Sequence, residues 1–444
     1  MSIKDYKKIH FIGIGGIGIS AIAKFLKAQG FIVSGSDCNE GSMTKELKSL
    51  GIPINIPHNA SVIKDFDLVV HSAIIKEDNE EIKEAKRQNI PVLSRKEMLP
   101  LILQDKKVYA VAGAHGKSTT TAILSAIMQD FSALIGAESK EFKSNTRALS
   151  GNGVVFEADE SDKSFLECNP TCAIVTNAEP EHMETYGHNL EEFYKAYYNF
   201  LKQAKKRVIN AEDKFLGSLD LEAIRLYPSK DISEVEYFLK EGEPRMRFRL
   251  QNGGRDFGKF EVYGLGEHIL IDAALAILSV VDILDLETLK RNLQRYRGIK
   301  KRFDILAHQD CIIIDDYAHH PTEIKATLEA LQKYKELVGG GEIQAIWQPH
   351  KYSRVLDNLE EFVECFRGVS KLIILPVYAA GEKKVEIDFK KLFASYNPIF
   401  ADYIQRDQDR LIVYKEGREI ELICKGIVIG FNAGDLTYQL RGGI

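Results

Sequence analysis

One stretch of sequence, residues 108–121, constrains this chain more than any other. An apolar run at 108–112 is followed by a glycine-bearing turn and then by Lys117, Ser118 and three threonines. This order predicts a buried strand, a phosphate loop and a helix. Backbone N–H groups of such a turn point at an anion, while Lys117 can reach outer phosphate oxygens and the Ser118 hydroxyl can ligate magnesium. The turn is shorter than a full Walker motif, because Val111 stands where that pattern needs glycine.

The first hundred residues carry a second glycine-rich turn. Residues 13–18 match G-x-G-x-x-G between an apolar strand at 9–12 and helical spacing from Ile17 onward, and the next strand, 31–37, ends in Asp37. Such a βαβ unit lets a nucleotide diphosphate approach the turn closely, and Asp37 stands where a ribose-binding acid belongs. The pattern predicts a nucleotide diphosphate site. The alternative is a glycine-rich turn without a ligand.

Acidic residues follow a strand in the middle of the chain. The apolar run at 154–156 leads into Glu157, Asp159, Glu160 and Asp162. Magnesium bound to nucleotide phosphates would offset this density of negative charge, and a solvated acidic turn is the alternative. The next strand, 173–177, leads to His182, for which both a metal-binding and a capping role stay open.

The last third repeats the pattern of buried strands with polar ends. The run 311–314 ends in Asp315, Asp316, Tyr317 and two histidines, and 343–347 leads into a cationic segment at 348–354. Further strands at 372–378 and 426–431 are expected to complete a parallel sheet with one edge facing a ligand. A basic segment at 296–303 is a plausible hinge, with cations able to reach phosphates.

Length and composition exclude several classes of protein. The 444 residues suggest about three domains. The net charge of −5 argues against a nucleic-acid-binding surface. The six scattered cysteines indicate reduced thiols in a cytoplasmic protein. No signal peptide and no membrane span are expected. Between residues 220 and 265, alternating polar and apolar positions predict small antiparallel strands, and 269–284 reads as an apolar helix.

Six motifs in a fixed order resemble those of the Mur ligases, the ATP-dependent amide ligases of peptidoglycan precursor synthesis. The resemblance covers nearly the whole chain and rests on residues 13–18 with 34–37, 113–118, 157–162, 176–183, 315–323 and 348–354. It implies an α/β fold of three domains. These are a Rossmann-like UDP-sugar-binding domain at 1–105, a central P-loop-type ATP- and magnesium-binding domain at 106–297, and a C-terminal Rossmann-like amino-acid-binding domain at 298–444.

The resemblance also implies an activity. Within the family, the motifs are most similar to those of the member that joins L-alanine to the carboxylate of UDP-N-acetylmuramate. That reaction passes through an acyl phosphate and yields ADP and phosphate, with ATP and Mg²⁺ as cofactors. The implied setting is the cytoplasm, in cell-wall biogenesis that supports cell shape and division, with no nucleic-acid or membrane partner and a monomeric or weakly dimeric state.

The resemblance assigns roles to residues. Implied catalytic residues are Lys117, His182, Arg302 and His319. Implied ATP-binding residues are Gly113, Ala114, His115, Gly116, Lys117, Ser118, Thr119, Asp272, Arg302 and Asp316. Implied substrate-binding residues are Gly15, Gly16, Gly18, Ser36, Asp37, Ser72, Arg95, Tyr317, His319, Lys351 and Arg354. Implied magnesium ligands are Ser118, Glu160 and His182.

Several positions depart from the family's usual motifs. Ala114 and Ser118 replace threonines of the phosphate loop, and glutamates flank His182 where aspartates are usual. Asp272 replaces an asparagine at the adenine pocket, and Lys351 replaces an arginine, which loses bidentate recognition of a carboxylate. Tyrosines at 197–198 stand near the position where several relatives carry a carbamylated lysine, so no such group is expected.

Three other functions compete with this interpretation. A murein-peptide-recycling ligase would join a preformed tripeptide to the same sugar nucleotide. An NAD-dependent dehydrogenase would explain the first βαβ unit but would leave the phosphate loop and acid clusters unused. A nucleotide-binding regulator without catalysis would explain the departures but not the presence of Lys117, Ser118, Glu160 and His182.

Overall fold

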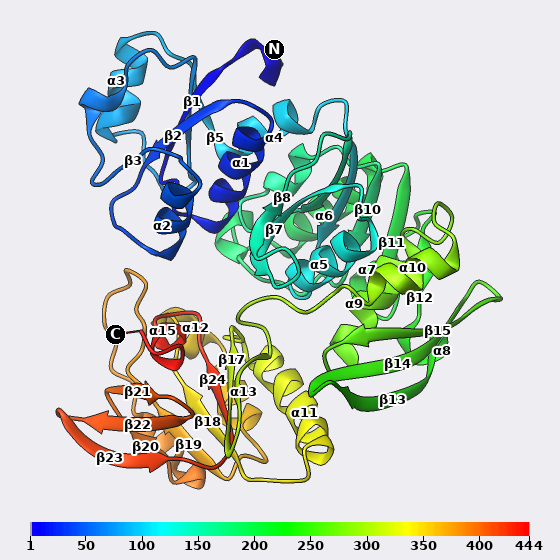
Figure 1. Cartoon of the computed structure of the whole chain (residues 1–444), viewed down its shortest axis with the longest axis vertical. Helices are drawn as coiled ribbons and strands as arrows, with labels where there is room; N and C mark the ends of the chain where they lie inside the picture. The colour runs from blue at the N-terminus through cyan, green and yellow to red at the C-terminus, as the bar shows by residue number, and fades with distance from the viewer. Residues whose placement is uncertain (1, 444) are drawn as a thin grey trace. The chain divides into compact units, whose positions relative to one another are not determined.

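The computed structural model describes residues 2–443 and divides by internal contacts into two units (Figure 1). Unit 1 comprises Met1–Val235, Arg247–Val262 and Leu270–Arg297. Unit 2 comprises Glu236–Met246, Tyr263–Ile269 and Gly298–Ile444. Unit 1 holds two large sheets and unit 2 holds one, so the α/β class expected from the sequence is confirmed.

The first sheet of unit 1 is parallel and has the order β3-β2-β1-β4-β5. Its strands are β1 (Lys8–Ile12), β2 (Ile32–Ser36), β3 (Ile54–Asn55), β4 (Leu68–His71) and β5 (Val92–Ser94), and its helices are α1 (Ile17–Ala28), α2 (Ser42–Ser49), α3 (Glu80–Arg87) and α4 (Arg95–Leu103), with short 3₁₀ turns at η1 (Ile3–Asp5) and η2 (Ala60–Val62). Strand β1 lies between β2 and β4. The chain continues from β1 to β2 and β3 on one side and later adds β4 and β5 on the other, so the strand order reverses at the carboxyl end of β1. In open α/β sheets a ligand binds at this point.

The second sheet of unit 1 has the order β12-β11-β10-β6-β9-β7-β8. Its strands are β6 (Lys107–Ala112), β7 (Ser132–Ser139), β8 (Ser144–Arg147), β9 (Gly153–Glu157), β10 (Cys172–Val175), β11 (Lys206–Asn210) and β12 (Ile224–Leu226). Its helices are α5 (Lys117–Ile127), α6 (Leu190–Gln203), α7 (Lys214–Ser218), α9 (Glu267–Leu278) and α10 (Leu286–Leu293), with 3₁₀ turns at η3 (Ser164–Glu167) and η4 (Met183–Tyr186). Because β6 pairs in parallel with β9 and β10, the segments that follow these three strands meet at one edge.

The segment 220–265 is more varied than its alternating pattern suggests. Ile224–Leu226 joins the second sheet in parallel with β11, so the prediction of a purely antiparallel segment was wrong there. A three-stranded sheet follows, formed by β13 (Ile232–Lys240), β14 (Glu243–Asn252) and β15 (Arg255–Tyr263), after the short α8 (Pro228–Asp231). The apolar helix begins at Glu267 and ends at Leu278, six residues before the predicted end.

Polar contacts dock the two large sheets of unit 1 onto each other. The Asn145 side chain on β8 donates to the carbonyl oxygen of Ile17 at 2.8 Å, and Lys24 on α1 donates to Asn145 Oδ1 at 2.9 Å. The Thr146 hydroxyl donates to the carbonyl oxygen of Ala21 at 3.1 Å. One apolar core includes buried residues of both parts, so α1 is fixed against β8 by packing and by hydrogen bonds.

The large sheet of unit 2 has the order β16-β17-β24-β18-β19-β20. Its strands are β16 (Asp304–His308), β17 (Cys311–Asp316), β18 (Ile343–Trp347), β19 (Lys371–Ile374), β20 (Ile399–Phe400) and β24 (Gly426–Phe431). Its helices are α11 (Pro321–Leu337), α12 (Tyr352–Asp357), α13 (Leu359–Cys365), α14 (Phe389–Leu392) and α15 (Leu436–Leu440), with a 3₁₀ turn at η5 (Ala394–Tyr396). The expected parallel sheet is confirmed except at its edge, where β16 pairs antiparallel with β17.

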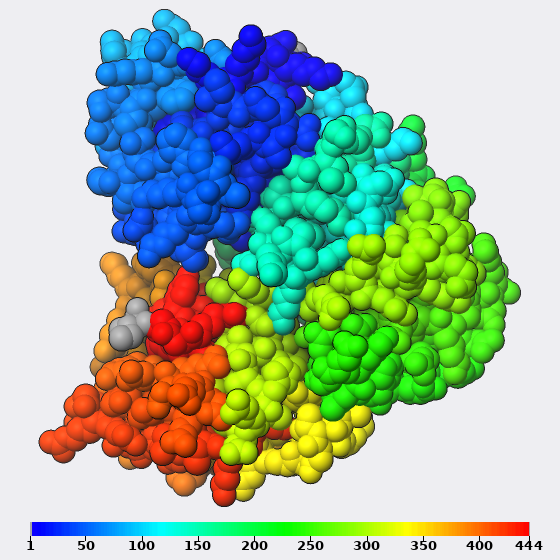
Figure 2. Space-filling model, in the orientation of Figure 1, coloured from blue at the N-terminus to red at the C-terminus, as the bar shows by residue number. Residues whose placement is uncertain are grey.

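Two features of unit 2 were not predicted. Strand β19 ends at Ile374 rather than at 378, and Pro376, which has no N–H to donate, follows two residues later. An antiparallel ribbon of β21 (Tyr403–Asp407), β22 (Arg410–Lys415) and β23 (Arg418–Ile423) projects from the surface of unit 2 (Figure 2).

A buried charge network holds the C-terminal helix of unit 2. The Arg441 guanidinium contacts the Asp304 and Asp315 carboxylates at 2.5 and 2.8 Å. The Thr437 hydroxyl donates to Asp315 at 2.7 Å, and the Asn432 amide donates to it at 3.2 Å. Both aspartates are buried. Arg441 therefore neutralises two carboxylates that have little access to water.

A second buried network lies under the first sheet of unit 1. The Glu81 carboxylate accepts hydrogen bonds from the Ser36 hydroxyl, from the Asn59 backbone N–H and from His10 Nε2. Burial opposes ionisation of Glu81, but these hydrogen bonds outweigh it, so its pKa lies below the usual value. His58 Nδ1 lies 2.9 Å from the same Ser36 hydroxyl.

The lowered pKa of Glu81 predicts a pH dependence of stability. Because the folded pKa lies below the unfolded one, ionised Glu81 stabilises unit 1 above about pH 4.3. This stabilisation is lost as the pH falls from there through the folded pKa. Glu81→Gln should therefore be less stable than the wild type at pH 7, and the difference should shrink toward pH 3. Urea denaturation followed by far-UV circular dichroism measures this.

The matched control is Glu80→Gln, because Glu80 is exposed on the same helix. This variant should unfold at the wild-type urea concentration at pH 7. A constant difference between Glu81→Gln and the wild type from pH 7 to pH 3 would contradict the assignment.

The structure also bears on membrane-spanning helices and on the state of the cysteines. Between residues 2 and 443, no helix combines the length and the apolar character needed to cross a bilayer. All six cysteines are free thiols, and only Cys38 and Cys424 are exposed.

Candidate functional site

The phosphate loop lies at the carboxyl edge of the second sheet of unit 1, between β6 and α5. Gly116 has φ +80° and caps α5, and a Cβ there would lie 2.5 Å from the Asp272 carboxylate. The N–H of His115 donates to Asn177 Oδ1 at 3.1 Å, and the Thr176 hydroxyl donates to the His115 carbonyl oxygen. These contacts fix the backbone of the loop at the N-terminus of α5, where N–H groups favour a bound anion.

Lys117 is folded over its own loop. Its ammonium donates to the Gly113 carbonyl oxygen at 2.6 Å, to the Ala114 carbonyl oxygen at 3.2 Å and to Glu160 Oε1 at 2.8 Å. A phosphate on the loop would offer this ammonium oxygens of higher charge than the two carbonyls. Lys117 is therefore already positioned for the outer phosphates of a nucleotide.

Ser118 contacts a carboxylate that the sequence analysis did not assign as a metal ligand. The Ser118 hydroxyl donates to Glu157 Oε1 at 3.0 Å, and the other oxygen of Glu157 accepts from the Gly136 N–H at 2.6 Å. A hydroxyl and a carboxylate this close supply the oxygen ligands that Mg²⁺ prefers. Glu157 stands at the end of β9, inside the predicted acid cluster, but nothing in the sequence distinguished it from its neighbours.

Glu160 contacts Lys117 rather than Ser118. It is almost fully buried, and burial raises its pKa to about 7, although the ammonium of Lys117 opposes that shift. The carbonyl oxygen of Glu160 accepts a hydrogen bond from the Tyr186 hydroxyl at 2.6 Å, which fixes the backbone of the acidic segment. Glu160 therefore forms an ion pair with Lys117, the lysine predicted to bind phosphate.

Two histidines of the predicted site, His115 and His182, each lie near glutamates. His115 Nε2 is 3.2 Å from Glu179 and 3.9 Å from Glu181. His182 has φ +53° and precedes η4. Its partly exposed side chain lies 3.9 Å from the Glu184 carboxylate. Among residues 2–443, His182 makes no hydrogen bond or ion pair with Ser118, so its metal-binding role stays a prediction.

Asp272 lies directly against the phosphate loop. It is on α9, far from Gly116 in sequence, and its carboxylate is buried there. The structure therefore brings this predicted nucleotide-binding residue to the loop. Thr119 lies in the first turn of α5 and is buried.

The glycine-rich turn of the first sheet carries a second group of predicted residues. Asp37 accepts a hydrogen bond from the Gly15 N–H at 2.8 Å, and Ser72 lies against Gly13 at the end of β4. Gly16 caps α1. Ser36, in contrast, is fully buried and its hydroxyl donates to Glu81, so the structure directs it away from the surface.

Arg95 and Gly18 are also brought together at this turn. A Cβ on Gly18 would lie 3.0 Å from Arg95 Nη1, while Arg95 Nη2 donates to Asp162 at 2.8 Å. Arg95 was predicted to bind substrate, and the structure shows that carboxylates of the acidic segment already hold it.

Unit 2 gathers its predicted residues at the carboxyl ends of β17 and β18. Arg302 Nη1 contacts Glu323 at 3.0 Å, and its guanidinium lies over the Tyr317 ring. His319 Nδ1 lies 2.8 Å from the Tyr317 carbonyl oxygen and 3.4 Å from Glu323. Glu323 was missed as a site residue. It is the third residue of α11 and accepts hydrogen bonds from the backbone N–H groups of His319 and His320, and a glutamate at this helix position is a usable signal.

The Asp316 carboxylate is held by backbone N–H groups. It accepts backbone hydrogen bonds from Phe303 and Ala318, both at 2.7 Å. Burial raises its pKa to about 6, and Arg302 opposes this shift. Asp316 therefore fixes the turn that presents Tyr317 and Arg302.

The end of β18 supplies a histidine and an arginine. Arg354 Nη1 donates to His350 Nδ1 at 2.9 Å, and the His350 ring stacks on Tyr378 and meets His319 edge-on. Burial lowers the pKa of His350 to about 4, so its ring is neutral near pH 7. Because arginine can only donate, His350 Nδ1 is the acceptor and Nε2 carries the proton. Lys351 has φ +65° and caps α12.

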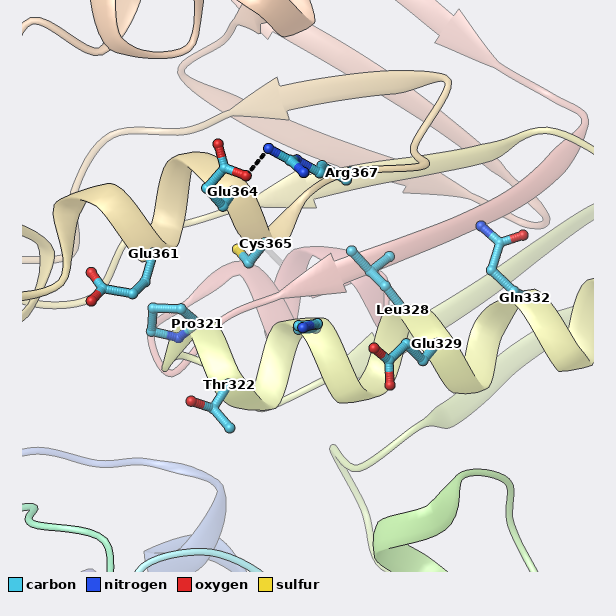
Figure 3. Close-up of a pocket in the computed structure, with 10 residues that line it drawn as sticks. Pro321, Thr322, Leu328, Glu329, Gln332, Glu361, Glu364, Cys365 and Arg367 are labelled. Atoms are coloured by element: carbon cyan, nitrogen blue, oxygen red, sulfur yellow. Dashed lines mark ion pairs between the residues drawn. The ribbon is translucent and has the colours of Figure 1, made fainter.

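A separate groove lies between α11 and α13 of unit 2 (Figure 3). Its volume is about 550 Å³, and Leu328 and Cys365 line it together with the ion pair between Glu364 and Arg367. It shares no residue with the predicted site. The phosphate loop, and not this groove, defines the class of the protein, which is a nucleotide-binding enzyme of the P-loop type.

Comparison with known proteins identifies the family. Residues 8–107 match the model described as Mur ligase family, catalytic domain, residues 111–280 match the Mur ligase middle domain, and residues 301–425 match the Mur ligase, glutamate ligase domain. The chain belongs to the Mur ligase family.

Two similar relatives and one similar solved structure carry the name of the same activity. The chain is 54% identical to UDP-N-acetylmuramate–L-alanine ligase of Campylobacter curvus, covering 98% of this chain and all of that protein. It is 56% identical to the ligase of that name from Helicobacter pylori strain P12, covering 98% and 96%. The crystal structure of UDP-N-acetylmuramate-alanine ligase MurC from Thermotoga maritima superposes with a TM-score of 0.80 at 27% identity, covering 98% and 97%.

Proposed function

We propose that this chain joins L-alanine to the carboxylate of UDP-N-acetylmuramate at the expense of ATP. The observation that carries the proposal is the phosphate loop with Lys117 and Ser118 beside Glu157, at an edge that a Mur-type fold supplies. Relatives that cover nearly the whole chain at 54% and 56% identity carry the name of this activity. ATP as the phosphoryl donor agrees with both observations.

Unit 1 would hold the two nucleotides. The UDP diphosphate would lie at the turn formed by Gly15, Gly16 and Gly18, with Asp37 on the ribose. ATP would lie on the phosphate loop with Lys117 at its outer phosphates. Ser118 and Glu157 would hold magnesium, with Glu160 and His182 as further candidates. Bound magnesium would neutralise charge on the phosphates.

The reaction requires two displacements. A carboxylate oxygen of UDP-N-acetylmuramate attacks the γ-phosphorus, the bond to ADP breaks, and an acyl phosphate forms. The amine of L-alanine then attacks the acyl carbon, phosphate leaves with the bridging oxygen, and the amine loses a proton. Lys117 stabilises charge that develops on the transferring phosphoryl group.

Unit 2 would bind the amino acid and take the proton. Arg354 and Lys351 would meet the carboxylate of alanine. Because the Tyr317 carbonyl oxygen can only accept, His319 Nδ1 carries the proton and Nε2 is the acceptor. Burial lowers the pKa of His319, so the neutral ring required of a base is present near pH 7. Arg302 and Asp316 remain candidates for contacts with the nucleotide.

Phosphate release tests the proposal. Purified protein should release phosphate from ATP only when UDP-N-acetylmuramate, Mg²⁺ and L-alanine are all present, and omission of any one should abolish release. Release with a preformed tripeptide in place of L-alanine would instead assign the recycling reaction. Retained nucleotide binding without release in either mixture would assign a regulator.

A further inference from the structure

Arg95 lies where the two nucleotide-binding parts of unit 1 meet. It is the first residue of α4, which Ser94 caps with a hydrogen bond to the Glu97 N–H. Its side chain is 13% exposed, although the residue belongs to the part of the chain that carries the glycine-rich turn. A largely buried arginine needs anionic partners, and those partners come from the other part of unit 1.

One nitrogen of Arg95 makes all of its polar contacts with the acidic segment. Nη2 lies 2.8 Å from Asp162, 3.4 Å from Asp159 and 2.9 Å from the Ser164 hydroxyl. The other terminal nitrogen, Nη1, faces Gly18. Among the described residues 2–443, Nη1 makes no hydrogen bond, and all those of the guanidinium are made by Nη2. The guanidinium can therefore hold the acidic segment and an anion at the turn simultaneously.

The acidic segment passes this restraint to the phosphate loop. Asp159 and Asp162 each accept a backbone N–H two residues later, from Ser161 and Ser164, which fixes a tight turn. Glu160 lies within that turn and pairs with Lys117 at 2.8 Å. Four charged side chains thus connect Gly18 to Lys117, which would hold the outer phosphates of ATP. They are Arg95, Asp162, Asp159 and Glu160.

We propose that Arg95 is a positioning residue that couples occupancy of the diphosphate site at Gly18 to nucleotide binding at the phosphate loop. The proposal rests on the proposed function, which supplies the two ligands. A diphosphate at the turn completes the hydrogen bonds of the guanidinium through Nη1. The acidic segment and Lys117 then lose freedom before the second nucleotide arrives, so the second nucleotide binds more tightly.

The test measures binding rather than turnover. ADP with Mg²⁺ is titrated calorimetrically into the full-length protein, with and without saturating UDP-N-acetylmuramate. In the wild type the sugar nucleotide should lower the Kd of ADP by at least about 5-fold, within the usual range of coupling between sites. In Arg95→Ala the ratio of the two Kd values should fall to about 1. Asp162→Asn should reduce the ratio in the same direction.

The matched control removes another polar contact between the same two parts. Lys24→Met breaks the contact of α1 with Asn145 but leaves Arg95 in place, so it should keep the wild-type ratio. Arg95→Lys should give an intermediate ratio, since one ammonium cannot present two nitrogens in a fixed fork.

The outcomes separate this proposal from the proposed function. A wild-type ratio near 1, a full ratio in Arg95→Ala, or an equal loss in Lys24→Met would each overturn the role of Arg95. Failure of UDP-N-acetylmuramate to bind the wild type would instead overturn the substrate assignment.

Discussion

Lys117→Met should lower the kcat/KM for phosphate release by at least about 10³-fold. The substitution removes the ammonium that, in the proposed function, meets the outer phosphates, and loss of a single stabilising donor in a transition state costs factors of about 10² to 10³. We expect kcat/KM to fall further, because the buried Glu160 carboxylate is left without the ammonium group that pairs with it. The measurement is steady-state phosphate release at saturating L-alanine and UDP-N-acetylmuramate.

Lys117→Arg is the matched control for charge. It should remain well below the wild type, because a planar guanidinium cannot occupy the place between the Gly113 and Ala114 carbonyl oxygens that the ammonium fills. Emission from Trp347, the single tryptophan and a residue of unit 2, should be unchanged in both variants. Activity within 10-fold of the wild type in Lys117→Met would contradict the assignment of the loop.

Arg441→Ala should destabilise unit 2 by about 3 kcal/mol. Removing one partner of a buried ion pair leaves an uncompensated charge, which typically costs 3–5 kcal/mol. Here two carboxylates, Asp304 and Asp315, lose their cation, while Thr437 and Asn432 still donate to Asp315. Urea denaturation followed by Trp347 emission measures this, because Trp347 is buried in the same sheet.

Arg87→Ala is the control for that variant. Arg87 also pairs with a carboxylate, Glu84, but lies on the exposed surface of unit 1, so the transition reported by Trp347 should not move. An equal shift in both variants, or none in Arg441→Ala, would show that the network does not support α15.

Local patterns predicted the parts of the fold and site that depend on neighbouring residues. The strand, turn and helix at 107–127 form as expected, because apolar periodicity, glycines and a lysine lie within one segment. The glycine-rich turn at 13–18 and its contact with Asp37 follow from the same kind of short-range pattern. The three-domain α/β fold is confirmed as well.

Long-range packing decided what the sequence could not show. Four acids follow β9, and only the pairing of β9 with β6 places Glu157, rather than Glu160, at the Ser118 hydroxyl. Ser36 ends a strand in the predicted site, yet its hydroxyl faces Glu81 inside the sheet. The ribbon of β21 to β23 was missed because its short strands carry charged residues on an exposed face, which weakens the alternation that identifies a strand.

In the proposed reaction, ATP activates the carboxylate of UDP-N-acetylmuramate. Substrate labelled with ¹⁸O in both oxygens of that carboxylate tests it directly, with the released phosphate examined by ³¹P NMR. An acyl phosphate transfers its bridging oxygen to the leaving phosphate, so each phosphate should carry one ¹⁸O atom. Unlabelled phosphate released with amide formation would show that the carboxylate never attacks the γ-phosphorus, and would contradict the proposed reaction.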